Sequence, residues 1–196
     1  MSTRTDLAIL AGPPGPIRAA VEQRLQQDHF HIEILAGGPR PQMKETAARL
    51  SRELGPPALL VTLPHSDDAC PFGQMPRDRW HRLLMEHLGL TVDACAAVVP
   101  LMVAAGRGTV VTTVSWLALA GVPGEAYTAA ASGSIIAFSK SFALEVARHG
   151  IRVNTVAIGR IGQGVHPADI AATIAFLHRD GDFFVGQVLR ATGGAA

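Results

Sequence analysis

The sequence is poor in lysine, in cysteine and in charge of either sign, and each shortage narrows the range of possible functions. Only 17% of its 196 residues are charged and the formal net charge is +1, which argues against a nucleic-acid or anionic-membrane partner. Cys70 and Cys95 have neither metal-ligand spacing nor the pattern of a disulfide framework, which suits a reducing cytoplasm. Lys44 and Lys140 are the only lysines, so few side chains can supply an ammonium group.

The sequence does not indicate targeting or membrane-spanning segments either. Arg4 and Asp6 precede a short apolar stretch, and this stretch does not have the character of the hydrophobic region of a signal peptide. We find no apolar run that we expect to span a bilayer, no internal repeat and no low-complexity tract. We therefore predict a single cytoplasmic domain over residues 1–196, with no membrane partner and no metal site.

Short apolar runs alternate with helical patterns along the chain. Uniformly apolar strands separated by helices are typical of a parallel sheet that is covered on both faces. We therefore expect a doubly wound α/β fold of about six strands, with a ligand crevice beyond the carboxyl ends of the strands. The predicted strands are 7–12, 31–37, 58–63, 108–114, 151–158 and 187–192, and the predicted helices are 16–27, 42–54, 75–106, 126–150 and 167–179.

Residues 106–159 carry a more specific signal, in the sequence GRGTVVTTVSWLALAGVPGEAYTAAASGSIIAFSKSFALEVARHGIRVNTVAIG. This stretch resembles the central part of the short-chain dehydrogenase/reductase (SDR) family. In that family a strand ends in a catalytic serine, a Gly-x-Pro-Gly-type loop follows, and Tyr-x-x-x-Lys opens the next helix. The resemblance covers most of the chain, and it implies a Rossmann-like fold and NAD(P)-dependent oxidoreductase chemistry.

The resemblance carries over to the catalytic positions one residue at a time. Ser115 matches the serine that orients the substrate carbonyl, and Tyr127 matches the proton-transferring tyrosine, with one residue fewer between them than usual. Ala131 stands where the family has the lysine that lowers the pKa of the tyrosine, and His87 falls where it has the asparagine of a water relay. An uncharged alanine cannot lower a phenol pKa that is ordinarily near 10. Lys140 lies roughly 20 Å beyond Tyr127 along a helix.

The phosphate-binding loop also departs from the family pattern, which is Thr-Gly-x-x-x-Gly-x-Gly between the first strand and helix. Here the stretch reads AGPPGPI, in which Gly12 and Gly15 remain as vestigial cofactor-binding glycines and Ile17 replaces the last glycine. We expect no bound cofactor, because the loop has lost backbone N–H donors that would face a pyrophosphate. Three prolines remove them: Pro13, Pro14 and Pro16.

Two further parts of the family's sites are shortened. Gly37 and Gly38 follow the second strand, where the family has an acidic residue that binds the ribose. Only one helix fits between the second and third strands, so the family's edge strand is missing there, and the substrate-covering segment is reduced to residues 160–165. Arg40 remains a candidate ligand for a 2′-phosphate and Asp67–Asp68 a candidate cation site, although such loop residues are more often simply solvated.

The predicted helix 126–150 carries apolar residues on more than one side, so we expect it to bury more than one face. The resemblance implies that this helix and the predicted helix 75–106 pack against a second subunit. We expect Phe138 and Phe142 to face the sheet. Three residues are predicted to face the partner: Ile136, Ala143 and Ala147.

Three functions remain open. The first is a non-catalytic subunit, a pseudoenzyme that forms homo-oligomers or assembles with an active SDR paralogue. The second is an NAD(P)-dependent reductase of atypical type. The third is a cofactor-free enzyme that uses Ser115, Tyr127 and His87 for proton transfer. For Ser115 and Tyr127 a structural hydrogen-bonding role, and for His87 a packing role, are the alternatives to chemistry.

Overall fold

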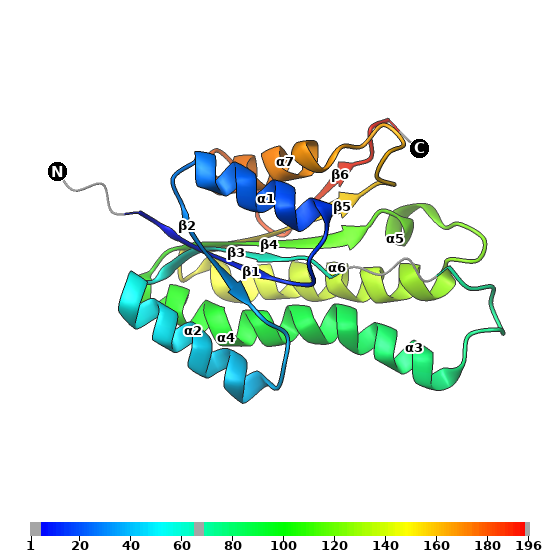
Figure 1. The fold of residues 1–196 in the computed structure, drawn as a ribbon, viewed down its shortest axis with the longest axis horizontal. Helices are drawn as coiled ribbons and strands as arrows, with labels where there is room; N and C mark the ends of the chain where they lie inside the picture. Colours follow the sequence, from blue (N-terminus) through cyan, green and yellow to red (C-terminus); the bar gives the residue numbers. More distant parts are fainter. Residues whose placement is uncertain (1–4, 65–68, 195–196) are drawn as a thin grey trace.

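The computed structural model describes residues 5–64 and 69–194, which form a six-stranded parallel sheet with helices on both faces (Figure 1). The strand order is β2-β1-β3-β4-β5-β6. The elements are β1 (Leu7–Ala11), α1 (Pro16–Gln27), β2 (His31–Leu35), α2 (Arg40–Leu54), β3 (Pro57–Thr62), α3 (Arg77–Leu84), a π-helical turn η1 (Met85–Gly89), α4 (Leu90–Ala105), β4 (Gly108–Ser115), α5 (Leu117–Ala120), α6 (Ala126–Ala147), β5 (Ile151–Ile158), α7 (Pro167–Arg179) and β6 (Val188–Ala191).

The predicted doubly wound α/β fold is confirmed, and each predicted strand corresponds to one observed strand. The predicted helix 75–106 begins two residues later and is interrupted by η1. The short helix α5, which follows β4, was not predicted, because four residues are too few for a helical period to show. A single helix, α2, connects β2 to β3, as expected, so β2 is an edge strand of the sheet.

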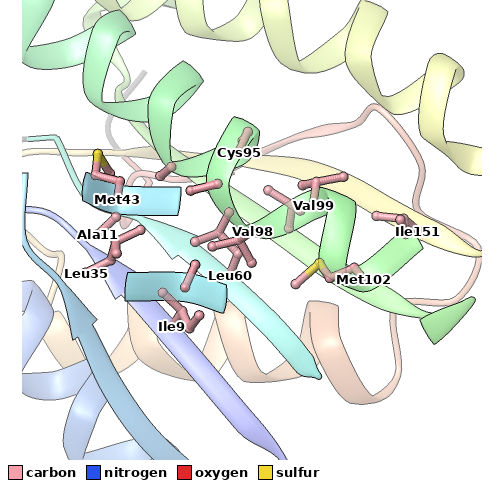
Figure 2. Packing of buried hydrophobic residues seen from close by; sticks show 14 of the residues in the cluster. Ile9, Ala11, Leu35, Met43, Leu60, Cys95, Val98, Val99, Met102 and Ile151 are labelled. Carbon is pink, nitrogen blue, oxygen red and sulfur yellow. The ribbon is translucent and has the colours of Figure 1, made fainter. Parts of the chain in front are cut away.

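The core consists of two apolar layers, one on each face of the sheet. Successive side chains of a strand point to opposite faces, so β1 contributes Ile9 to the layer under α2, α4 and α6, and Leu10 to the layer under α1 and α7. Figure 2 shows Ile9, Leu60 and Val98 packed together in the first layer. Burial of one such side chain contributes roughly 1.5–3 kcal/mol, which explains why both faces of β1 are apolar.

The side of α6 that faces the core differs in part from the prediction. Ala143 is fully buried, which corrects the expectation that it faces a partner. A Cβ atom placed on Gly186, in the loop before β6, would lie 3.5 Å from the Ala143 Cβ, so the small side chain fits this loop. Ala147 is exposed, and Phe138 and Phe142 stack with ring centroids 5.1 Å apart against the core, as expected.

The helical stretch Arg77–Ala105 contains an apolar window that we did not count from the sequence as a possible membrane span. It runs for 29 residues, and its most apolar window has a mean hydropathy of 2.0, so by length and composition alone it could cross a bilayer. This corrects the expectation that no run is long enough. A core helix of a globular protein passes the same test, and α4 buries Val98 and Met102 against the sheet. The stretch is therefore weak evidence for a membrane segment.

His178, near the end of α7, gives the fold a predictable pH dependence. Its ring meets Phe30 edge-on with centroids 5.1 Å apart, and its Nδ1 lies 3.2 Å from the hydroxyl of Thr109. Burial, and secondarily the positive charge of Arg152, lower the pKa of His178 below its ordinary value of 6.5. The unfolded chain therefore binds a proton more readily than the folded chain as the pH falls below 6.5.

We expect the free energy of unfolding to decrease as the pH falls below 6.5. In His178→Gln this dependence on pH should be weaker. Glutamine keeps a hydrogen-bonding group but cannot take up a proton. Urea denaturation of both proteins between pH 8 and pH 5 measures the difference, and the other histidines are common to both. Equal pH dependence in the parent and the variant would show that His178 does not contribute.

Candidate functional site

A cavity of about 650 Å³ lies at the carboxyl ends of the central strands, where doubly wound folds bind their ligands. Three segments contribute to its wall: the loop before α1, the turn after β4 and the loop after β5. We call this cavity the crevice. The polar and charged residues that line it are Arg18, His87, Thr113, Ser115, Glu125, Thr128 and Arg160.

Ser115 is the last residue of β4 and is held there by two hydrogen bonds. Its Oγ accepts a bond from the backbone N–H of Leu117 at 3.4 Å, in the turn that opens α5. Its own N–H donates to the Oγ of Ser132 at 3.3 Å, which ties the end of β4 to α6. The predicted residue Ser115 thus lies in the crevice, and Ser132 fixes the backbone beside it.

Tyr127 is not among the residues that line the crevice. Its ring stacks on Phe72, with centroids 6.3 Å apart, and tilts against Trp80 of α3 at 5.4 Å. Phe72 is 83% exposed, so this aromatic group lies at the protein surface. The structure therefore does not bring Tyr127 to the crevice that Ser115 lines.

Thr128, the next residue, lines the crevice instead. Counting one residue further from Ser115 restores the spacing that the family resemblance implies, and four more residues lead to Ser132. Moving one position along an α-helix turns the side chain by about 100°, which is the difference between facing the crevice and facing Trp80. The position for the family's lysine is then Ser132, which is fully buried, as Ala131 is. The shortened spacing was the signal in the sequence that could have revealed this register.

Neither Thr128 nor Ser132 can replace a tyrosine and a lysine in acid–base chemistry. Both carry aliphatic hydroxyl groups, which supply a donor and acceptors but no phenol and no positive charge. The Oγ1 of Thr128 is buried and has no hydrogen-bond partner within residues 5–64 and 69–194. This hydroxyl is therefore a buried polar atom without a partner at the wall of the crevice.

His87 reaches the crevice from η1, the π-helical turn between α3 and α4. Its side chain is buried, with 4% of the residue exposed. A π turn contains one residue more than an α-helical turn and is often found at functional sites. The structure thus places His87 and Ser115 in the same crevice, as the family positions implied.

The two glycines of the loop between β1 and α1 have different structural requirements. Gly12 has a φ of 152°, and a Cβ there would lie 2.4 Å from the carbonyl oxygen of Leu63, so the close approach of β3 requires glycine. Gly15 has an extended backbone, and no atom lies within 4 Å of the position that its Cβ would take. Arg18 donates a 3.0 Å hydrogen bond to the Gly12 carbonyl. Packing alone therefore accounts for Gly12.

The remaining candidate ligands from the sequence are engaged or lie outside the described residues. Arg40 forms an ion pair with Asp93 at 2.6 Å, which joins the start of α2 to α4. Asp67 and Asp68 belong to the segment 65–68, which is outside the described part of the chain. Within the described part, no group of three or more His, Cys, Asp and Glu side chains could hold a metal ion.

Comparison with known proteins places these features in a family context. The sequence model of the family described as short chain dehydrogenase matches residues 13–168. The chain is 32% identical over 149 residues to a 3-oxoacyl-(acyl-carrier-protein) reductase of Chlamydia trachomatis, which covers 63% of this chain and 59% of the relative. It is 27% identical over 178 residues to the corresponding reductase of Thermotoga maritima, covering 79% and 72%.

The chain therefore spans about three fifths of the length of the Chlamydia relative. A crystal structure of NAD+-bound xylitol dehydrogenase shares the fold, with a TM-score of 0.88 over 98% of this chain and 100% of that chain. The sequence identity to it is 19%, so this likeness concerns the fold.

Proposed function

The chain belongs to the short-chain dehydrogenase family, and from the crevice we propose that it is a family member that does not catalyse hydride transfer by itself. The observation that carries this proposal is the register of α6. The spacing from Ser115 leads to Thr128 and Ser132, whereas Tyr127 lies in a surface aromatic group. No phenol with a neighbouring cation is then available to exchange a proton with a substrate carbonyl.

The former cofactor site supports the same proposal. NAD(P), when bound, supplies or accepts the hydride in this family, and its pyrophosphate needs N–H groups at the start of the first helix. In this chain Pro16 occupies the first position of α1, and the Ile17 side chain lines the crevice at the next. Pro13 and Pro14 line the same wall and donate no N–H groups. These residues do not fit the pyrophosphate of a dinucleotide.

Two alternatives keep specific support. The curated relatives named above are 3-oxoacyl-(acyl-carrier-protein) reductases, which favours an atypical reductase as the second candidate. The shared crevice of His87, Ser115 and Thr128 favours a cofactor-free enzyme as the third. Measuring NADPH absorbance in the presence of a 3-oxoacyl thioester distinguishes the reductase from the other two candidates, because only the reductase consumes NADPH. The proposal expects no turnover, whereas NADPH consumption at a rate typical of the family would favour the reductase.

We further propose that the chain acts by assembly, with itself or with an active SDR paralogue, through α4 and α6. Both helices cover the same face of the sheet as α2 (Figure 1). Leu144 of α6 is 76% exposed, so its side chain is free to contact a partner on this face. The cytoplasmic location remains a prediction from the sequence.

Leu144→Asp is expected to convert the oligomer to a monomer without loss of folding, because the side chain makes few contacts within its own chain and an unpaired charge in an interface is costly. Size-exclusion chromatography with light scattering measures the mass. The matched control is Ala19→Asp, at an exposed position of α1 on the other face of the sheet. A monomeric parent that also fails to co-purify with an SDR encoded beside it would contradict assembly through this surface.

A further inference from the structure

The outer edge of β2 presents unpaired backbone groups to solvent. His31 donates its N–H to Asp6 beside β1, so His31, Glu33 and Leu35 turn their backbone groups toward β1. The backbone groups of successive residues in a strand point alternately to its two edges. Ile32 and Ile34 therefore turn their N–H and C=O groups away from the sheet. No backbone partner for these groups is found among the described residues. Figure 1 shows β2 crossing in front of β1, with α1 above it and α2 below.

The side chains of this edge are complementary to themselves in one antiparallel register. His31 and Glu33 lie on the α2 face, 3.0 Å apart, and both are partly exposed. A two-fold axis through Ile32 would pair each Ile32 with Ile32 of a second copy and set His31 opposite Glu33 on both sides. Shifting the register by two residues sets Glu33 against Glu33, and like charges directly opposite are destabilising. A shift the other way sets His31 against His31 and loses the pairing of each imidazole with a carboxylate.

The opposite face contributes an apolar contact in the same register. Counting from Ile32 sets Ile34, which is 37% exposed, opposite Phe30 of the second copy. Phe30 precedes β2, packs its ring against His178 and donates its N–H to the Leu25 carbonyl, so that N–H is not available for strand pairing. The register is therefore set by the α2 face.

We propose that β2 pairs antiparallel with β2 of a second copy of this chain, through the register that pairs Ile32 with itself. A second copy is the fitting occupant because it presents Glu33 and His31 in reversed order. In an SDR that has the family's additional edge strand, that strand covers the strand equivalent to β2. Such a protein therefore has no free edge at this position. The strand is short, so this contact adds to the proposed α4–α6 surface and does not depend on it.

Disulfide trapping tests the contact and its register. His31→Cys and Glu33→Cys are made as two separate proteins, mixed and oxidised, and then run on a non-reducing gel. In the proposed register the two Cα atoms lie about 4.5 Å apart as a non-hydrogen-bonded pair, within the range of a disulfide. Two copies of the same variant place their cysteines about 8 Å apart, from a rise of about 3.4 Å per residue, which a disulfide does not span.

We expect linked dimers in the mixture and little linkage in either protein alone or in the parent, whose Cys70 and Cys95 are buried. Ile32→Pro added to both proteins removes an outward N–H and should abolish linkage, and Ile34→Lys is the second variant if the proline impairs folding. Absence of linked dimer in the mixture would overturn the pairing. Equal linkage in the mixed and unmixed samples would overturn the register.

Discussion

Ala131→Lys is expected to yield a strongly destabilised protein that still lacks reductase activity. Ala131 is fully buried on the side of α6 that faces the sheet, although the sequence places it four residues after Tyr127. A lysine there would put an ammonium group in the core without a partner, at a cost of roughly 3–5 kcal/mol. Because the side chain does not line the crevice, the new charge cannot serve the chemistry either.

Urea denaturation measures the lost free energy of unfolding, and NADPH absorbance with a ketone substrate measures activity. Ala130→Lys is the matched control, since Ala130 is exposed on the same helix and should change stability by no more than about 0.5 kcal/mol. If Ala131→Lys were as stable as the parent and consumed NADPH, the register assigned to α6 would be wrong.

Gly12→Ala is expected to destabilise the protein strongly, whereas Gly15→Ala is expected to have little effect. A methyl group at Gly12 would lie 2.4 Å from the Leu63 carbonyl oxygen, and the φ of 152° is one that residues with a side chain rarely adopt. Overpacking costs about 1–3 kcal/mol, and the strained backbone adds about 1–3 kcal/mol. At Gly15 the space is open and the backbone is extended.

Thermal and urea denaturation of the two alanine variants measure this contrast. The result bears on function because both glycines belong to the loop that aligns with the family's phosphate-binding loop. A large loss for Gly12→Ala alone would show that this glycine is required by the packing of β1 against β3. Comparable small losses at both positions would remove the packing explanation for Gly12.

The sheet could be predicted from the sequence because its signal is strong and repeated. Every residue of β1 and of β3 is buried, and only a strand covered on both faces requires such a run. The missing edge strand was also predictable, since too few residues separate β2 from β3 for a helix and a further strand.

The register of α6 could not be predicted in the same way. The segment between Ser115 and α6 contains the short helix α5 and a loop, and one residue fewer in it changes which side chain faces the crevice. The residue type in the sequence indicated Tyr127 as the catalytic position, whereas the packing of α6 places Thr128 in the wall of the crevice. Sequence patterns identify residue types, but this choice depends on a rotation of about 100° that only three-dimensional packing determines.

The burial of Ala143 was unpredictable for a related reason. Helix α6 is apolar on several sides, so its pattern did not distinguish the side that faces the sheet from a side that faces a partner. The contact that encloses Ala143 comes from Gly186, in a loop more than forty residues away in the chain. His87 was placed by resemblance, but the π turn that carries it has no periodicity that the sequence reveals.

Calorimetric titration with NADH and NADPH tests most directly the proposal that this family member does not bind the cofactor on which hydride transfer depends. The Thermotoga maritima reductase, titrated in parallel, serves as the control for the measurement. For this chain we predict no heat of binding with either nucleotide beyond that of dilution, because prolines occupy the N–H positions of the loop and Ile17 lines the crevice. A saturable isotherm with a Kd in the low micromolar range would contradict the claim and restore the reductase as the function.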